Sequence, residues 1–118
     1  MAGRPVHQLR IYEIFEHNEA AFHDRFRDHA WRIMQRHGFR VLGFWTARSD
    51  ARLEFVYLLE WPDGATMRAA WADFLADPEW VEIKRRTNAA HGDLVGEVQE
   101  RVLEATPYSP WSDRPEPG

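Results

Sequence analysis

The run Phe55-Val56-Tyr57-Leu58-Leu59 is the part of the sequence that most restricts the possible folds. It lies within an expected strand from 53 to 61 and does not alternate between apolar and polar residues. A strand with apolar side chains on both sides has both of its faces covered. Helices of the same small domain cover one face only, so the pattern indicates that a second copy of the chain covers the other.

Hydrophobic periodicity assigns the rest of the chain to strands and helices. A period of two predicts strands over 6–14, 39–47 and 93–106, and the turn at 48–51 joins 39–47 to 53–61 as a hairpin. Helical spacing predicts helices over 18–37, with Asn18 as N-cap and Gly38 at its end, over 65–76, and from Pro78 to near Asn88. The order β-α-β-β-α-(α)-β predicts an α+β, ferredoxin-like domain with a four-stranded antiparallel sheet. Two such sheets packed face to face form a dimeric α+β barrel.

The length of 118 residues fits one domain. We expect a short N-terminal extension over 1–5, the folded domain over 6–106 and an extended, Pro-rich C-terminal tail over 107–118. The N-terminus has no apolar segment of the signal-peptide kind, and no apolar run approaches the roughly 20 residues that cross a bilayer. These features predict a cytoplasmic protein with no membrane partner.

Composition and missing motifs argue against several classes of partner and site. Fifteen Lys and Arg against 19 Asp and Glu give a net charge of −4, which argues against a nucleic-acid partner. There is no Cys, no His-Glu-x-x-His motif, no glycine-rich phosphate loop and no Gly-x-Ser-x-Gly motif. We therefore expect no bound metal and no cofactor.

Four segments resemble the NIPSNAP family, and together they extend over residues 7–110. The resemblance lies in an opening strand, a helix end with the strand that follows it, an acid-Pro-Glu-Trp turn and a closing Pro-aromatic-Ser-Pro segment. In this sequence these are Gln8-Leu9-Arg10-Ile11-Tyr12; His29 with His37-Gly38-Phe39 and Leu42-Gly43-Phe44-Trp45; Asp77-Pro78-Glu79-Trp80; and Thr106-Pro107-Tyr108-Ser109-Pro110.

The resemblance implies a dimeric α+β barrel and a homodimer. It leaves the function open, because the wider superfamily contains cofactor-free oxygenases, isomerases, dehalogenating and haem-degrading enzymes, and binding proteins. Two positions depart from the family pattern: Tyr57 stands where the family often has His, and Trp61 where it often has Tyr.

Arg10 and Tyr12 are the first candidates for a site. They are two residues apart in an expected strand, so they lie on the same face. A guanidinium beside a phenol can hold a carboxylate or an enolate. The structural alternative is an Arg10 that pairs with Glu54 or Glu97 and a Tyr12 that packs beneath a helix.

Two further residues are candidates for proton transfer in a catalytic group of Arg10, Tyr12, His29 and Glu54. His29 lies at the border of the buried helical stripe, where it could reach the sheet as a general base. Its structural alternative is a hydrogen bond to the backbone at the helix edge.

The aromatic residues provide candidate walls for a ligand pocket. The predicted ligand-binding residues are Trp45, Tyr57, Trp61, Trp71 and Trp80. The alternative is that the tryptophans fill the core and the dimer interface.

These observations favour a homodimeric small-molecule-binding protein, or a cofactor-independent enzyme, that acts on a hydrophobic, partly anionic metabolite. One alternative is a non-catalytic dimeric scaffold whose segment Tyr108-Ser109-Pro110-Trp111 binds a partner protein. A second alternative is a haem-handling protein, because haem needs only one His ligand.

Overall fold

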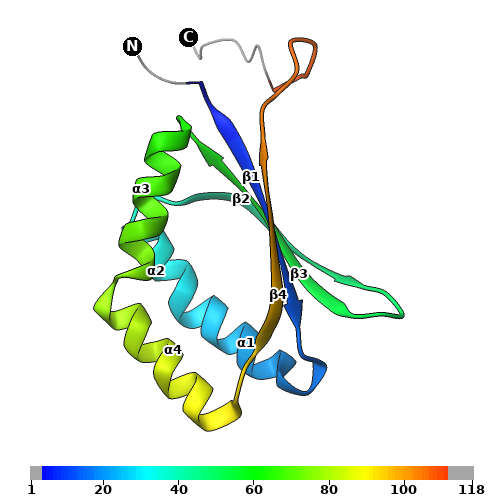
Figure 1. The fold of residues 1–118 in the computed structure, drawn as a ribbon, viewed down its shortest axis with the longest axis vertical. Helices are drawn as coiled ribbons and strands as arrows, with labels where there is room; N and C mark the ends of the chain where they lie inside the picture. Colours follow the sequence, from blue (N-terminus) through cyan, green and yellow to red (C-terminus); the bar gives the residue numbers. More distant parts are fainter. Residues whose placement is uncertain (1–3, 112–118) are drawn as a thin grey trace.

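Four antiparallel strands form a single sheet in the order β2-β3-β1-β4, and helices cover one of its faces (Figure 1). The computed structural model describes residues 4–111. The strands are β1 (Val6–Ile14), β2 (Arg40–Arg48), β3 (Leu53–Trp61) and β4 (Val95–Leu103). The helices are a short 3-10 turn η1 (Glu16–Asn18), α1 (Glu19–Arg25), a π-helical turn η2 (Phe26–Ala30), α2 (Trp31–Arg36), α3 (Gly64–Leu75) and α4 (Pro78–His91). This architecture confirms the predicted ferredoxin-like α+β fold.

The helices α1, η2 and α2 run on from one another, and we call them the first helical segment. It contains a π-helical turn, η2, that the sequence pattern did not predict. Phe22, Phe26 and Ala30 follow one another at steps of four, which in a regular α-helix drift around the axis. A π turn holds one more residue per hydrogen-bonded ring, and so it keeps all three side chains on the buried face. Asn18 stands at the N-cap position of α1, as predicted, but its side chain makes no capping hydrogen bond. Its side-chain amide donates instead to the carbonyl oxygens of His91 and Asp93, at 3.0 and 2.8 Å, which ties η1 to the end of α4.

The start of α4 agrees with its sequence signal. The Asp77 carboxylate accepts hydrogen bonds from the backbone N–H groups of Glu79 and Trp80, at 2.9 and 3.4 Å. It also contacts Arg36 and His37 at the end of the first helical segment, both at 2.8 Å. One side chain therefore starts α4 and joins it to α2.

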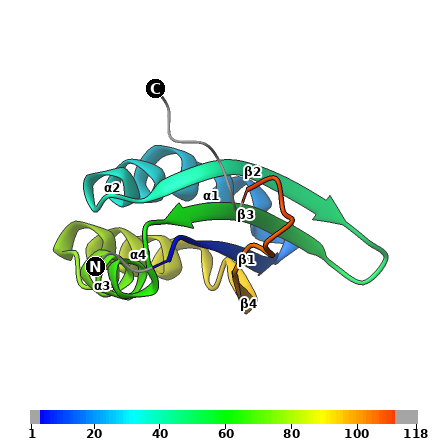
Figure 2. The ribbon, with the colours of Figure 1, turned by 90° about the horizontal axis from the view of Figure 1, so that it is seen from above.

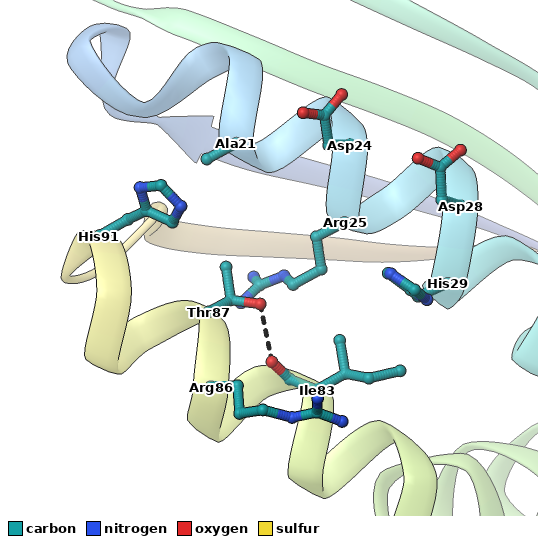
Figure 3. Close-up of a pocket in the computed structure, with 9 residues that line it drawn as sticks. All are labelled: Ala21, Asp24, Arg25, Asp28, His29, Ile83, Arg86, Thr87 and His91. Atoms are coloured by element: carbon teal, nitrogen blue, oxygen red, sulfur yellow. Dashed lines mark hydrogen bonds between the residues drawn. The ribbon is translucent and has the colours of Figure 1, made fainter.

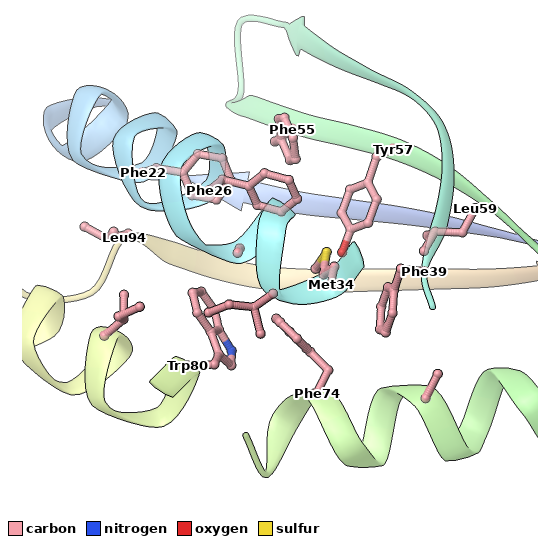
Figure 4. Close-up of a cluster of buried hydrophobic side chains, with 14 of the residues drawn as sticks. Phe22, Phe26, Met34, Phe39, Phe55, Tyr57, Leu59, Phe74, Trp80 and Leu94 are labelled. Carbon is pink, nitrogen blue, oxygen red and sulfur yellow. The ribbon is translucent and has the colours of Figure 1, made fainter. Parts of the chain in front are cut away.

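The core lies between the sheet and the helices and is largely aromatic (Figure 4). The buried rings include Phe22, Phe26, Phe39, Phe55, Tyr57, Trp61, Phe74 and Trp80. They pack mainly edge to face or tilted, such as Phe39 against Trp61 with centroids 4.9 Å apart at 73°.

The burial of β3 alternates, which corrects the premise of the sequence argument. Phe55, Tyr57 and Leu59 are fully buried beneath the helices, whereas Val56 and Leu58 face the other side of the sheet and are half-buried. The helices do not cover that second side, which we call the open face (Figure 1). The β2–β3 hairpin extends beyond the helical layer (Figure 2).

The C-terminal segment is folded where the structure describes it. Residues 107–111 form turns, with the Ser109 N–H bonded to the Thr106 carbonyl at 3.0 Å, so the prediction of an extended tail is wrong for these residues. The Trp111 ring packs edge to face on His7, with centroids 5.4 Å apart. Residues 1–3 of the expected N-terminal extension and 112–118 of the expected tail lie outside the described residues.

None of the helices within residues 4–111 has the length and apolar character needed to cross a membrane.

Candidate functional site

Arg10, Tyr12 and Tyr57 form a polar cluster on the helix-facing side of the sheet. Arg10 and Tyr12 share this face of β1, as predicted, and Arg10 is paired in register with Tyr57 on β3. The Arg10 guanidinium donates to the Tyr12 hydroxyl oxygen at 3.3 Å, and the Tyr12 and Tyr57 hydroxyls are hydrogen-bonded to each other. Tyr57 is fully buried. The cluster therefore has a buried end at Tyr57 and a more accessible end at Arg10.

The Arg10 guanidinium stacks over the Trp71 ring, with its central carbon 4.3 Å from the ring centroid. Its nearest carboxylate is Glu100 on β4, at 3.5 Å, the outer limit of a hydrogen bond. The Nε of Arg10 is buried and has no hydrogen-bond partner among the described residues. The sequence analysis expected Glu54 or Glu97 as the partner of Arg10, but both of these carboxylates bind Arg52 instead.

The surroundings keep Arg10 charged and Tyr57 neutral. Burial works against the charge of Arg10, but the neighbouring Tyr12 and Tyr57 outweigh it and raise the pKa of Arg10 above its usual 12.5. Burial also raises the pKa of Tyr57 well above its usual 10.0, and Arg10 opposes this shift only in part. Arg10 is therefore a fixed cation and Tyr57 a neutral phenol at physiological pH.

Gln8 organises the residues behind the cluster. Its side-chain oxygen accepts from the indole N–H groups of Trp61 at 2.9 Å and Trp71 at 2.7 Å, and its amide nitrogen donates to Glu100. Gln8 thus fixes both the ring that stacks on Arg10 and the carboxylate that faces it.

A cavity of about 220 Å³ adjoins the cluster between the sheet and the helices. Arg10, Tyr12 and Trp71 line one part of it, and Arg25 on α1 and Lys84 on α4 line another. The remaining walls are apolar: Phe22, Phe26, Ala30, Met34, Phe74, Leu75, Trp80, Val95 and Val98. We refer to it as the cationic cavity, because its described lining contains three cationic side chains and no carboxylate.

Arg25 and Lys84 have no acidic partner within 4.0 Å among residues 4–111. Arg25 bonds the Asn88 side-chain oxygen at 3.3 Å, and both cations lie near the Trp80 ring, at 5.4 and 5.8 Å from its centroid. Burial lowers the pKa of Arg25 from its usual 12.5, yet an arginine stays charged under all ordinary conditions. Arg25 is half-buried, although it lies among charged residues of the first helical segment.

The structure separates Glu54 and His29 from Arg10 and Tyr12. Glu54 lies on the open face of β3, across the sheet from the cluster. His29 lines a different hollow between the first helical segment and α4, where its ring lies 3.1 Å from the Arg32 guanidinium (Figure 3). The four predicted catalytic residues therefore do not form one group.

The predicted aromatic wall is also divided. Trp71 and Trp80 line the cationic cavity, and Trp61 is buried behind it, where it bonds Gln8. Trp45 lies on the open face and is 54% exposed. The alternative, that the tryptophans fill the core, describes Trp61 correctly.

Within residues 4–111, no group of three or more His, Asp or Glu side chains is arranged so that it could hold a metal ion.

Sequence comparison assigns the chain to a family. The sequence profile of the NIPSNAP family matches residues 7–110. The chain belongs to the NIPSNAP family. A comparison with curated proteins found no significant match.

Solved structures share the fold. A NIPSNAP-like domain protein from Burkholderia xenovorans superposes with a TM-score of 0.75 at 22% identity, over 91% of this chain and 90% of that one. A NIPSNAP family protein from Agrobacterium tumefaciens gives a TM-score of 0.77 at 15% identity, over 92% and 99%. SnoaB, a cofactor-independent oxygenase from Streptomyces nogalater, gives 0.51 at 15% identity, over 92% and 99%. At these identities the likeness concerns the fold.

Sequence reasoning missed four residues that build the site: Gln8, Arg25, Lys84 and Glu100. Lys84 follows Trp80 by four positions, a helical spacing that places the two side chains together. Glu100 lies on an edge strand whose register with β1 becomes known only from the fold.

Proposed function

We propose that this NIPSNAP protein is a homodimer that binds a hydrophobic, partly anionic small molecule in the cationic cavity. The observation that carries the proposal is the charge of the cavity. Arg10, Arg25 and Lys84 line it, only Arg10 has a carboxylate nearby, and that carboxylate is 3.5 Å away. The rest of the lining is largely apolar and aromatic.

The charge balance of the cavity favours an anion. Partly buried cations without close counter-ions have lost part of their hydration, and an anionic ligand restores the lost interactions. The unpartnered Nε of Arg10 is a further donor for such a ligand. The protein as a whole carries −4, so the positive charge is local to the cavity.

The tyrosine pair places hydroxyl groups beside Arg10. Tyr57 is a neutral phenol, and the Tyr12 and Tyr57 hydroxyls share one hydrogen bond in which either can be the donor. Arg10 donates to the Tyr12 oxygen. When Tyr57 donates to Tyr12, the Tyr12 proton can bind a ligand. Arg10 and Tyr12 thus orient the anionic end, and Trp71 and Trp80 enclose the apolar part.

The open face supports the dimer. Strand register places Trp45, Val56 and Ile11 in one row across the face, and Gly43, Leu58 and Leu9 in the next. These rows form an apolar strip in the centre of the face that the helices leave uncovered. The C-terminal segment packs beside the strip, where Trp111 contacts His7. A second copy with the same strip is the natural partner for the remaining apolar surface.

Ligand binding is tested with 2-naphthoate, a flat apolar molecule with one carboxylate. The expected result is saturable binding that Arg10→Met weakens about 10- to 100-fold, the loss expected for a charge-assisted hydrogen bond. Arg85→Met, at an exposed position of α4, is the matched control and should leave the affinity unchanged. Equal affinities for wild type and Arg10→Met would refute the assignment of the site. Native mass spectrometry of the purified protein would also report the mass of any ligand already bound.

The dimer is tested by the same native mass spectra and by Val56→Glu. This change places a carboxylate in the centre of the apolar strip but leaves the helix-covered core intact. We expect a dimer for the wild type and a monomer for the variant. A monomeric wild type would refute the dimer.

Enzymatic activity is the second candidate function. It is supported by the likeness in fold to the cofactor-independent oxygenase SnoaB and by the Tyr12 hydroxyl beside a fixed cation. On a converted substrate, Tyr12→Phe should abolish turnover and retain most of the binding, because it removes the proton but not the ring. Turnover that persists in this variant would exclude Tyr12 as the proton donor.

If no ligand binds and partner capture depends on residues 107–118, the scaffold alternative is favoured. A Soret band after addition of haem would instead favour the haem alternative.

A further inference from the structure

A second hollow lies between β2, β3 and the first helical segment, on the opposite side of Phe26 from the cationic cavity. It has a volume of about 470 Å³ and is lined by His23, Phe26, Arg27, Trp31, Phe44 and Phe55. We call it the aromatic hollow. Among the described residues, Phe26 is the one that lines both spaces.

The walls of the aromatic hollow consist of four rings in contact with one another. Trp31 and Phe44 meet edge to face, with centroids 5.1 Å apart at 81°, and Phe26 meets Phe44 at 5.4 Å and 75°. Phe44 and Phe55 are nearly parallel, at 19° and 5.9 Å. Edge-to-face and parallel contacts both occur among these rings, and these are the two arrangements in which a further aromatic ring packs.

The arginine at the aromatic hollow already has acidic partners. Arg27 binds the carboxylates of Asp24 at 3.0 Å and Asp28 at 2.8 Å, and His23 lies 3.7 Å from Glu19. The hollow therefore lacks the excess positive charge of the cationic cavity, and an anion would gain little there.

Phe44 is unusually exposed for a residue on the helix-covered side of the sheet. It lies on the helix-facing side of β2, opposite Tyr57, yet it remains 38% exposed because the helices do not close over it. A small apolar ligand bound against Phe44 would remove this apolar surface from water, which favours binding.

We propose that the aromatic hollow is a second binding site, specific for a flat, uncharged aromatic molecule. The occupant stacks on Phe44 and Trp31 and fills space that Phe26 separates from the cationic cavity. This site does not depend on the proposed anion site, because the two share only Phe26 and differ in charge.

The test uses 2-naphthol and 2-naphthoate, which share one ring system and differ in charge at neutral pH. Indole N–H signals of ¹⁵N-labelled protein report each tryptophan separately, and Trp31→Phe assigns the signal of Trp31. We expect 2-naphthol to shift the Trp31 signal saturably and to leave that of Trp71 in place. We expect 2-naphthoate to shift that of Trp71. A 2-naphthol titration that leaves Trp31 unmoved, or that moves all exposed tryptophans without saturation, would overturn the proposal.

A pair of variants separates the two sites. Trp31→Ala removes one wall and should weaken 2-naphthol binding about ten-fold, since an aromatic pair contributes beyond its buried area. Its affinity for 2-naphthoate should not change. Arg10→Met should weaken 2-naphthoate binding and leave the affinity for 2-naphthol unchanged. Loss of 2-naphthoate binding alone refutes the anion site, whereas equal 2-naphthol affinities of wild type and Trp31→Ala refute the aromatic one. If Trp31→Ala does not fold, the wild-type titration still decides the question. Trp31 shifts that depend on protein concentration, and not on 2-naphthol, would mean that a second copy covers the hollow.

Discussion

Replacing Gln8 by leucine tests whether one buried amide holds the site together. Gln8 is 1% exposed, and its oxygen accepts from two indole N–H groups. Trp61 is itself 1% exposed, so water cannot replace the lost acceptor, and its orphaned N–H costs about 1–3 kcal/mol. Trp71 is half-exposed and can turn to water, so its lost bond costs about 0.5–1.5 kcal/mol. The expected loss is about 1.5–4.5 kcal/mol in the free energy of unfolding.

Urea denaturation measures this loss, and two variants serve as controls. Gln35→Leu, at an exposed position of α2, should change the free energy of unfolding by less than about 0.5 kcal/mol. Gln8→Glu keeps the acceptor oxygen but places a buried carboxyl beside Glu100, and both burial and that neighbour raise the pKa of the new group. A group whose pKa is raised on folding destabilises the fold increasingly as the pH rises above its unfolded value, about 4.3 for Glu.

Gln8→Glu should therefore be close to wild type in acid and weaker at neutral pH. If Gln8→Leu and Gln35→Leu have the same stability within about 0.5 kcal/mol, Gln8 does not organise the site, and the reasoning fails.

Two further predictions concern the ends of helices. Asp77→Asn keeps the N-cap oxygen of α4 but loses the charge that contacts Arg36 and His37, at a cost of about 1 kcal/mol at neutral pH. These partners hold the pKa of Asp77 below its usual 3.8, so the difference from wild type should shrink as the pH falls below that value, and a pH-independent difference in urea midpoint would contradict the assignment. Gly38→Ala should cost about 1–2 kcal/mol, because Gly38 has φ +83°, a conformation that side chains oppose; thermal unfolding unchanged from wild type would refute this.

The strands were the most predictable part of the molecule. The ranges 6–14 and 53–61 match β1 and β3, and the expected strand at 39–47 differs from β2 by one residue at each end. Alternation and turn residues determine such strands locally. The π turn in the first helical segment was not predicted, since a drift of about 40° per step of four is too small for hydrophobic spacing to distinguish a regular α-helix from one with a π turn.

The site was predictable in part, through Arg10 and Tyr12 and through Tyr57, Trp71 and Trp80 among the expected ligand-binding residues. Arg10 and Tyr12 share a face because strand geometry requires it. Arg25 and Lys84 have long side chains whose charged ends lie near the Trp80 ring, and charge in the sequence does not distinguish such residues from solvated ones. Gln8 acquires its role from partners 53, 63 and 92 residues away, which only the tertiary fold brings together. His29 and Glu54 were grouped with Arg10 on chemical type, and the fold separates them.

The sheet has two unpaired edges, β2 and β4, and their side chains differ in a way that affects solubility. β4 has charged residues along its length, among them Glu97, Glu100 and Arg101, which discourage strand addition by another chain. β2 has arginines only at its two ends, with the apolar segment Val41-Leu42-Gly43-Phe44-Trp45 between them. The irregular pairing between Val41 and Gly43 interrupts that edge, and the Trp45 ring lies over Gly43. In a crowded solution, this irregularity makes β2 a poorer template for strand addition than its apolar sequence alone would be.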